Sequence, residues 1–216
     1  MSQISSITGR VGPGTGADGN SGSPFRQAKT LEGVFSQAHG KYYEATHRGN
    51  VYSVTNGATG QAPGTALGTH PPILLYNPVG SGKRLKIMKV TGGYISGTLG
   101  AGTIFHCGQA STGTAPVVGS GTQLTPFNMD VGAANNSVAV AFANGTLSAN
   151  PTPLYPFATV NAELATTATN PTQIEEDVDG NIVVEPGGTW CLEGVTAAGS
   201  APLMSFGVVW EEVPVV

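Results

Sequence analysis

At 216 residues the chain is long enough for one large all-β domain or two small ones. Charged residues make up only 10%, well below the roughly 25% of an average soluble domain, and the 32 glycines are about twice the usual share. This composition excludes a mainly helical protein. No apolar run approaches the roughly 20 residues that cross a bilayer, so we expect a soluble protein, made in a cytoplasm, that binds no membrane.

Positive charge is confined to the first part of the chain. Residues 1–89 hold nine Lys and Arg against three acids, a net charge of 9 − 3 = +6, whereas residues 90–216 hold ten acids and no Lys or Arg. Such an asymmetry usually reflects different partners or different faces of one protein. It raises the question of what the basic residues up to Lys89 contact.

The first 40 residues differ in composition from the rest. Residues 1–24 are rich in Gly and Ser and have almost nothing apolar to bury, and such a segment is disordered unless a partner holds it. Residues 25–40, FRQAKTLEGVFSQAHG, could form a short helix or an extended clip. We therefore predict an extended N-terminal arm over residues 1–40 and a single domain over residues 41–216.

From Lys41 onward the apolar residues tend to alternate with polar ones. The segment KYYEATHRGNVYSVTN predicts strand structure, and Asn56 with Gly57 predicts a turn. Further strand-like runs, separated by Gly, Pro and Asn, are ILLY, RLKIMKV, YISGTL, TIFHCG, SVAVAFA, YPFATV, NIVVE, TWCLEGV and LMSFGVVWEEV. Short runs with this spacing predict an all-β fold, a β-sandwich of the jelly-roll-like kind.

The run KRLKIMKV predicts a strand with one apolar and one basic face. Leu85 and Ile87 share one side, and Arg84 and Lys86 share the other. The simpler interpretation is a solvated face whose lysines protect a sheet edge. The alternative is a docking stripe for an acidic surface, including the acidic half of a neighbouring subunit.

Two further features leave alternatives open. Asp177 and Asp179 before Gly180 resemble part of a calcium-binding loop, but the rest of that pattern is missing and a strand-like run follows, so a hairpin turn is favoured. Cys107 and Cys191 could join two strands by a disulfide. Because nothing resembles a secretory signal, we expect them to be reduced and buried.

No catalytic arrangement stands out in the sequence. The histidines occur singly, the cysteines form no C-x-x-C, and neither a G-x-S-x-G elbow nor a P-loop is present. Glu175, Glu185 and Glu211 could formally supply the acid pair of a glycoside hydrolase. His106 beside Cys107 lies in an apolar run and is expected in the core. We predict a protein that is not an enzyme and binds no cofactor or metal.

The chain resembles a known family in several segments taken together: the Gly/Ser-rich N-terminus, LYNPVGSGKRLKIMKV, the Thr/Gly/Ala-rich middle, VVEPGGTWCLEG and LMSFGVVWEEVPV. They are similar to tailed-phage virion proteins, in particular small jelly-roll capsid decoration (cement) proteins, over most of residues 41–216. The resemblance implies a homotrimer on the capsid surface, assembled in the host cytoplasm. It also implies binding to the major capsid protein, with arms lying across neighbouring capsid subunits.

Under this resemblance the basic residues would contact an acidic capsid surface, and the acidic remainder would face solvent or the trimer itself. The residues predicted to bind this partner are Arg10, Arg26, Lys29, Lys41, Arg48, Arg84 and Lys86. Nucleic-acid binding is not expected, because the bases are scattered and the acidic half would oppose it.

Two other functions are alternatives to capsid decoration. A tail or head-fibre component could bind a host receptor or glycan through Tyr155, Phe157 and Trp190, although these side chains are expected in the core. A polysaccharide hydrolase on a sandwich scaffold would need carboxylates clustered in a cleft, whereas the acids here cluster at a predicted turn.

Overall fold

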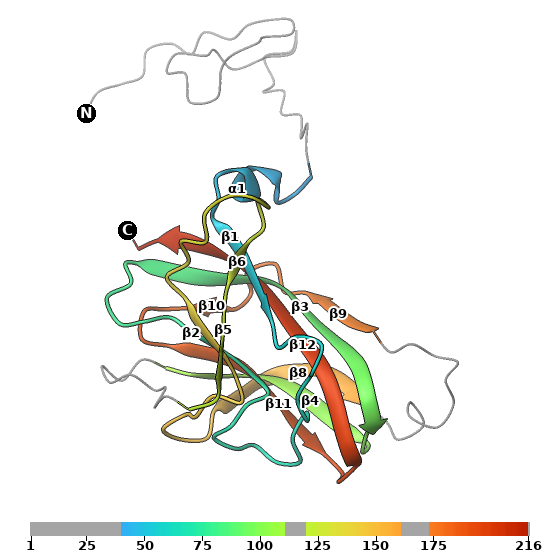
Figure 1. Cartoon of the computed structure of the whole chain (residues 1–216). Helices are drawn as coiled ribbons and strands as arrows, with labels where there is room; N and C mark the ends of the chain where they lie inside the picture. Colours follow the sequence, from blue (N-terminus) through green and yellow to red (C-terminus); the bar gives the residue numbers. More distant parts are fainter. Residues whose placement is uncertain (1–39, 111–119, 161–172, 216) are drawn as a thin grey trace, which may run out of the picture. The chain divides into compact units, whose positions relative to one another are not determined.

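The structure is a computed structural model that describes residues 40–110, 120–160 and 173–215. The chain separates into two units, Met1–Glu44 and Ala45–Val216. All strands of the described residues belong to the second unit (Figure 1). Most of the arm predicted for residues 1–40 lies outside the described residues.

A short helix, α1 (Tyr43–His47), occupies the place where alternation predicted a strand beginning at Lys41. The prediction was wrong for these residues, whereas the later part of the same run, through Val51 and Val54, forms the strand β1 (Val51–Thr55). The backbone is satisfied locally, because the Asn50 amide donates to the Ala45 carbonyl at 3.1 Å and Gly49 ends the turn with φ 69°. Alternation over so few residues does not distinguish a strand from one helical turn.

The described strands of the second unit form two antiparallel six-stranded sheets. The first has the order β10-β3-β12-β1-β6, with β9 also paired to β3; its strands are β1 (Val51–Thr55), β3 (Lys83–Thr98), β6 (Phe127–Asn128), β9 (Gln173–Asp177), β10 (Val183–Val184) and β12 (Ser200–Pro214). The second has the order β5-β7-β2-β11-β4-β8; its strands are β2 (Ile73–Tyr76), β4 (Gly102–Gln109), β5 (Thr122–Leu124), β7 (Val140–Ala143), β8 (Thr152–Val160) and β11 (Thr189–Thr196).

The strand pairs are nested along the chain. β1 pairs with β12, β2 with β11, β3 with β9 and β10, and β4 with β8. A chain paired in this way is one long hairpin rolled into two sheets, which is the connectivity of a jelly roll. The predicted all-β, jelly-roll-like sandwich is therefore confirmed.

Apolar side chains fill the space between the sheets. Trp190 of β11 and Trp210 and Phe206 of β12 are fully buried there. Alternate residues of the second sheet point to its other face, where a smaller cluster contains Leu74, Cys107, Leu147 and Cys191, with Leu67, Phe105 and Phe142 packed against it. The second sheet is thus covered on both faces, which explains why its central strands have few polar residues.

Strand β3 joins two runs that the sequence separated. Leu85 and Ile87 are buried, as alternation predicted. The pairing with β12 then shifts register so that Ile87 and Lys89 face consecutive residues, which makes Met88 the extra residue of a β-bulge. Because of this bulge, Lys86 and Lys89 lie on the same outer face although they are three residues apart.

The predicted hairpin at Asp179 and Gly180 is wrong. β9 and β10 both pair with β3, so residues 178–182 interrupt one edge of the sheet and do not connect two mutually paired strands. Both residues do adopt a turn conformation, with φ of 52° and 83°. The sequence therefore predicted the turn correctly, but the strands on its two sides, β9 and β10, pair with β3 and not with each other.

Candidate functional site

The outer face of β3 carries a row of ion pairs. Arg84 Nε lies 2.8 Å from Glu185 Oε1, and Lys86 Nζ lies 3.7 Å from Glu211 Oε2. Lys89 contacts Glu175 and lies 3.3 Å from Asp177 Oδ1 of β9. The hydrogen bond to Glu175 raises the pKa of Lys89. We call these seven residues the β3 ion row.

The β3 ion row accounts for part of the charge asymmetry along the chain. Its basic residues come from before residue 90 and its acids from after it, so halves of opposite charge meet within one sheet. Three bases against four acids give the row a net charge of 3 − 4 = −1. Exposed pairs of this kind contribute only about 0–1 kcal/mol each.

The residues predicted to bind an acidic partner have different surroundings. Arg84 and Lys86 share the outer face of β3, and both are paired with carboxylates of the same chain. Lys41 Nζ lies 5.0 Å from the centre of the Tyr42 ring, a cation–π distance. Arg48 follows α1 and makes contacts within the protein. The three remaining residues, Arg10, Arg26 and Lys29, lie outside the described residues.

A buried carboxylate, which the sequence analysis missed, anchors one end of the first sheet. The Glu212 side chain is 0% exposed and accepts three hydrogen bonds. Lys83 Nζ donates to Oε2 at 2.9 Å, and Ser137 Oγ and the Val138 amide donate to Oε1 at 2.6 and 2.9 Å. The available signal was alternation, since Glu212 is two residues from the buried Trp210.

At the same end of the first sheet, β1 and β3 begin and β12 finishes (Figure 1). The segments at this end include exposed apolar side chains. Val131 is 93% exposed. The loops here are tied to the strands, because the Met129 amide donates to the Val51 carbonyl and the Val215 amide to the Gly82 carbonyl, both at 2.9 Å. We call this set the apolar end: Val79, Met129, Val131, Val213 and Val215. Exposed apolar groups of this kind mark interaction sites when they form a patch.

His106 of β4 links the two sheets through Glu176 of β9. Its Nδ1 accepts a hydrogen bond from Trp190 Nε1 at 3.1 Å, and its Nε2 lies 3.0 Å from Glu176 Oε2. An indole N–H can only donate, so Nδ1 is unprotonated and Nε2 donates to the carboxylate. Burial lowers the pKa of His106, which favours this neutral form.

Aromatic rings enclose His106. Tyr155, Phe157 and Trp190 have ring centres 4.6, 5.3 and 5.8 Å from the imidazole. Burial, followed by the Glu176 charge, raises the pKa of Tyr155 to about 12. His106 is 0% exposed, which confirms its predicted place in the core. Both imidazole nitrogens have partners, so the geometry fits a structural link between the sheets.

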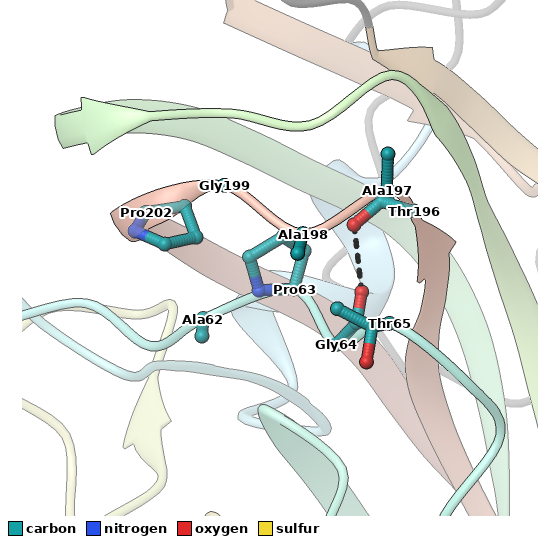
Figure 2. A pocket seen from close by; sticks show the side chains of 9 residues that line it. All are labelled: Ala62, Pro63, Gly64, Thr65, Thr196, Ala197, Ala198, Gly199 and Pro202. Atoms are coloured by element: carbon teal, nitrogen blue, oxygen red, sulfur yellow. Dashed lines mark hydrogen bonds between the residues drawn. The ribbon is translucent and has the colours of Figure 1, made fainter.

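A pocket of about 300 Å³ lies between the loop before β2 and the connection from β11 to β12 (Figure 2). Small side chains line it: Ala62, Pro63, Gly64, Thr65, Thr196, Ala197, Ala198, Gly199 and Pro202. Thr196 Oγ1 donates to the Gly64 carbonyl at 2.8 Å and so holds the two segments together. This lining offers hydroxyl groups and no charged side chain.

Thr196→Val is expected to lower the free energy of unfolding by about 1–2 kcal/mol, because it removes this hydrogen bond with little change in shape. Urea unfolding would measure the loss. Thr65→Val on the opposite wall, where the side chain is exposed, is expected to change stability by less than about 0.5 kcal/mol. Equal effects of the two substitutions would show that the bond does not hold the segments together.

Within residues 40–110, 120–160 and 173–215, no three His, Cys, Asp or Glu side chains are grouped as metal ligands would be. In the same residues no helix has the length and apolar character needed to cross a membrane. Comparison with protein-family models, curated proteins and solved structures finds no match to this chain.

Proposed function

We propose that this protein is a non-enzymatic virion protein that binds the outside of a tailed-phage capsid, contacts the major capsid protein and reinforces the shell. The observation that carries the proposal is the apolar end. A folded sandwich that leaves Val131 93% exposed, with further exposed apolar side chains in the segments at the same end of the first sheet, has a surface suited to a protein partner. The jelly-roll fold is compatible with this role and does not by itself specify it.

The N-terminal segment supports the same role. The chain enters the sandwich at the apolar end, where the Asn50 carbonyl accepts a hydrogen bond from the Glu212 amide at 2.9 Å. Residues 1–40 precede this point in the sequence and include Arg10, Arg26 and Lys29. A Gly/Ser-rich segment that becomes ordered on binding gives low affinity per unit area but can extend over several subunits.

Electrostatics would add a salt-dependent contribution. Arg84 and Lys86 already have intramolecular partners, so the first 40 residues, with Arg10, Arg26 and Lys29, become the more favourable source of contacts to an acidic capsid. Exposed charges are screened within about 10 Å at 0.1 M salt. Assembly as a homotrimer would compensate for weak single contacts through avidity, by on the order of a hundredfold or more.

The test is binding to candidate phage capsids stripped of accessory proteins, measured as copies per particle at low and high salt. We expect copies in the hundreds for the full-length protein, reduced by salt and by deletion of residues 1–40. Val131→Asp is expected to reduce binding, because it places a charge in the apolar end. Val195→Asp is the matched control, since Val195 is an exposed valine of β11 in the second sheet.

Full occupancy after deletion of residues 1–40 would refute the role of the arm. Equal binding by the Val131→Asp and Val195→Asp variants would refute the role of the apolar end. Binding at a single vertex, in a few copies, would instead favour the tail or head-fibre function. Circular dichroism of each variant would confirm that the sandwich is folded before occupancy is compared.

A further inference from the structure

The two cysteines of the chain meet in the middle of the second sheet. Cys107 of β4 lies directly opposite Cys191 of β11 in the antiparallel register. Both are free, fully buried and part of the cluster on the outer face of that sheet. Residues directly opposite each other in antiparallel strands have Cα atoms about 4.5–5.5 Å apart. This spacing falls within the range of about 4.4–6.8 Å found in disulfides.

We propose that Cys107 and Cys191 form a redox-active dithiol, which a small-molecule disulfide such as oxidised glutathione converts into a cross-strand disulfide. The bond would join β4 to β11 at the centre of the second sheet. This inference is independent of the proposed capsid role, because it depends only on the register of two strands.

The reaction is thiol–disulfide exchange in two steps. The thiolate of one cysteine attacks a sulfur of oxidised glutathione, which gives a mixed disulfide and releases one glutathione thiolate. The thiolate of the other cysteine then attacks the protein sulfur of the mixed disulfide and releases the second glutathione. The two cysteines are oxidised, one oxidised glutathione is reduced to two thiols, and the two protons pass to the departing thiolates.

The burial of Cys107 and Cys191 determines the conditions under which this exchange is fast. The two thiols are 0% exposed and belong to an apolar cluster with Leu147, against which Leu67 and Phe142 pack, so this cluster forms their cover. Burial, followed by the neighbouring Cys107 thiol, raises the pKa of Cys191, so little thiolate is present in the closed structure. Attack requires that this cover opens locally, and we therefore expect slow oxidation of the folded protein and fast oxidation during refolding.

The bond should raise thermal stability strongly. It would connect residues 191 − 107 = 84 positions apart, and bonds that close long loops restrict the unfolded chain most. For a chain of this length we expect the Tm to rise by about 5–15 °C.

The experiment compares full-length protein refolded in oxidised glutathione with protein refolded in dithiothreitol. We expect the intact mass of the oxidised protein to be lower by two hydrogen atoms, and we expect no free thiol. On a non-reducing denaturing gel it should run as a single chain, because no disulfide joins two chains. Peptide mapping should find Cys107 linked to Cys191. The Tm should rise as predicted and return to the reduced value after dithiothreitol is added.

Cys107→Ala and Cys191→Ala are the control variants. Refolding in oxidised glutathione should not raise the Tm of either variant, because neither can form the cross-strand disulfide. Two unreacted thiols after oxidative refolding would overturn the proposal, as would a stable glutathione adduct on one cysteine or a disulfide between two chains. If either variant fails to fold, the mass and peptide map of the natural chain still decide the question.

Discussion

Lys83→Met is expected to lower the free energy of unfolding by about 2–4 kcal/mol, although it removes only one side chain from the rim of the sandwich. Lys83 Nζ donates to Glu212, whose side chain is 0% exposed. Without the lysine, this carboxylate stays buried with no positive charge beside it. Breaking a buried ion pair typically costs about 3–5 kcal/mol; we expect less, because Ser137 and Val138 still donate hydrogen bonds and the Lys83 side chain is 30% exposed.

Urea unfolding of the Lys83→Met and Lys86→Met variants provides the test, because both substitutions remove a lysine from β3. Lys86 pairs with the partly exposed Glu211 at 3.7 Å, so its loss should change stability by less than about 0.5 kcal/mol. Adding Glu212→Gln to Lys83→Met should recover part of the loss, because the buried charge is then absent. Similar losses for the two single variants would contradict the assignment of Glu212 as a buried charge anchor.

The fold was predictable because local pattern and tertiary structure agree over most of the chain. ILLY forms β2 with the predicted bounds, and TWCLEGV and LMSFGVVWEEV lie within β11 and β12. Alternation also assigned Leu85 and Ile87 to the core. Gly and Pro between such runs predicted the turns, so the sandwich class could be inferred from the sequence alone.

Two of the misses, β9 and the bulge at Met88, have the same physical cause, which is pairing between distant segments. QIEED has no apolar alternation, yet it forms β9 against β3, where Lys89 meets Glu175 and Asp177. The sequence positions of these partners differ by more than 80 residues, so no local sequence pattern predicts that they pair. The bulge at Met88 depends on the register between β3 and β12, so it could not be predicted from the sequence either.

The candidate site was predicted less well than the fold. Charge asymmetry correctly identified β3 as a basic strand, but it could not show that Arg84 and Lys86 are paired within the chain. The apolar end was missed because single exposed valines in loops have no sequence signature. Sequence reasoning thus predicts which residues are charged or buried, whereas their partners depend on how distant strands are brought together.

Glu193→Gln is expected to raise the free energy of unfolding by about 2–3 kcal/mol at pH 8 and by much less at pH 5. Glu193 of β11 is 2% exposed, and burial raises its pKa to about 7. A backbone hydrogen bond from Gly68 opposes this shift. Among the described residues, Oε1 has no hydrogen-bond partner.

The sign of the pH dependence follows from the raised pKa. Between about pH 4.5 and pH 7 the folded protein binds more protons at Glu193 than the unfolded chain, so the natural protein loses stability as the pH rises through this window. A neutral glutamine does not titrate and removes this contribution. Urea unfolding of both proteins at pH 5 and pH 8 would measure the difference, in which the titration of all other groups cancels.

Glu185→Gln is the control, because the Glu185 side chain is 54% exposed and pairs with Arg84 at the surface. We expect that variant to change stability by less than about 1 kcal/mol. If Glu193→Gln has the same effect at pH 5 and pH 8, Glu193 is ionised in the folded protein at both values. A carboxylate that is 2% exposed in this structure would then have to reach solvent, which would contradict its burial on the outer face of the second sheet.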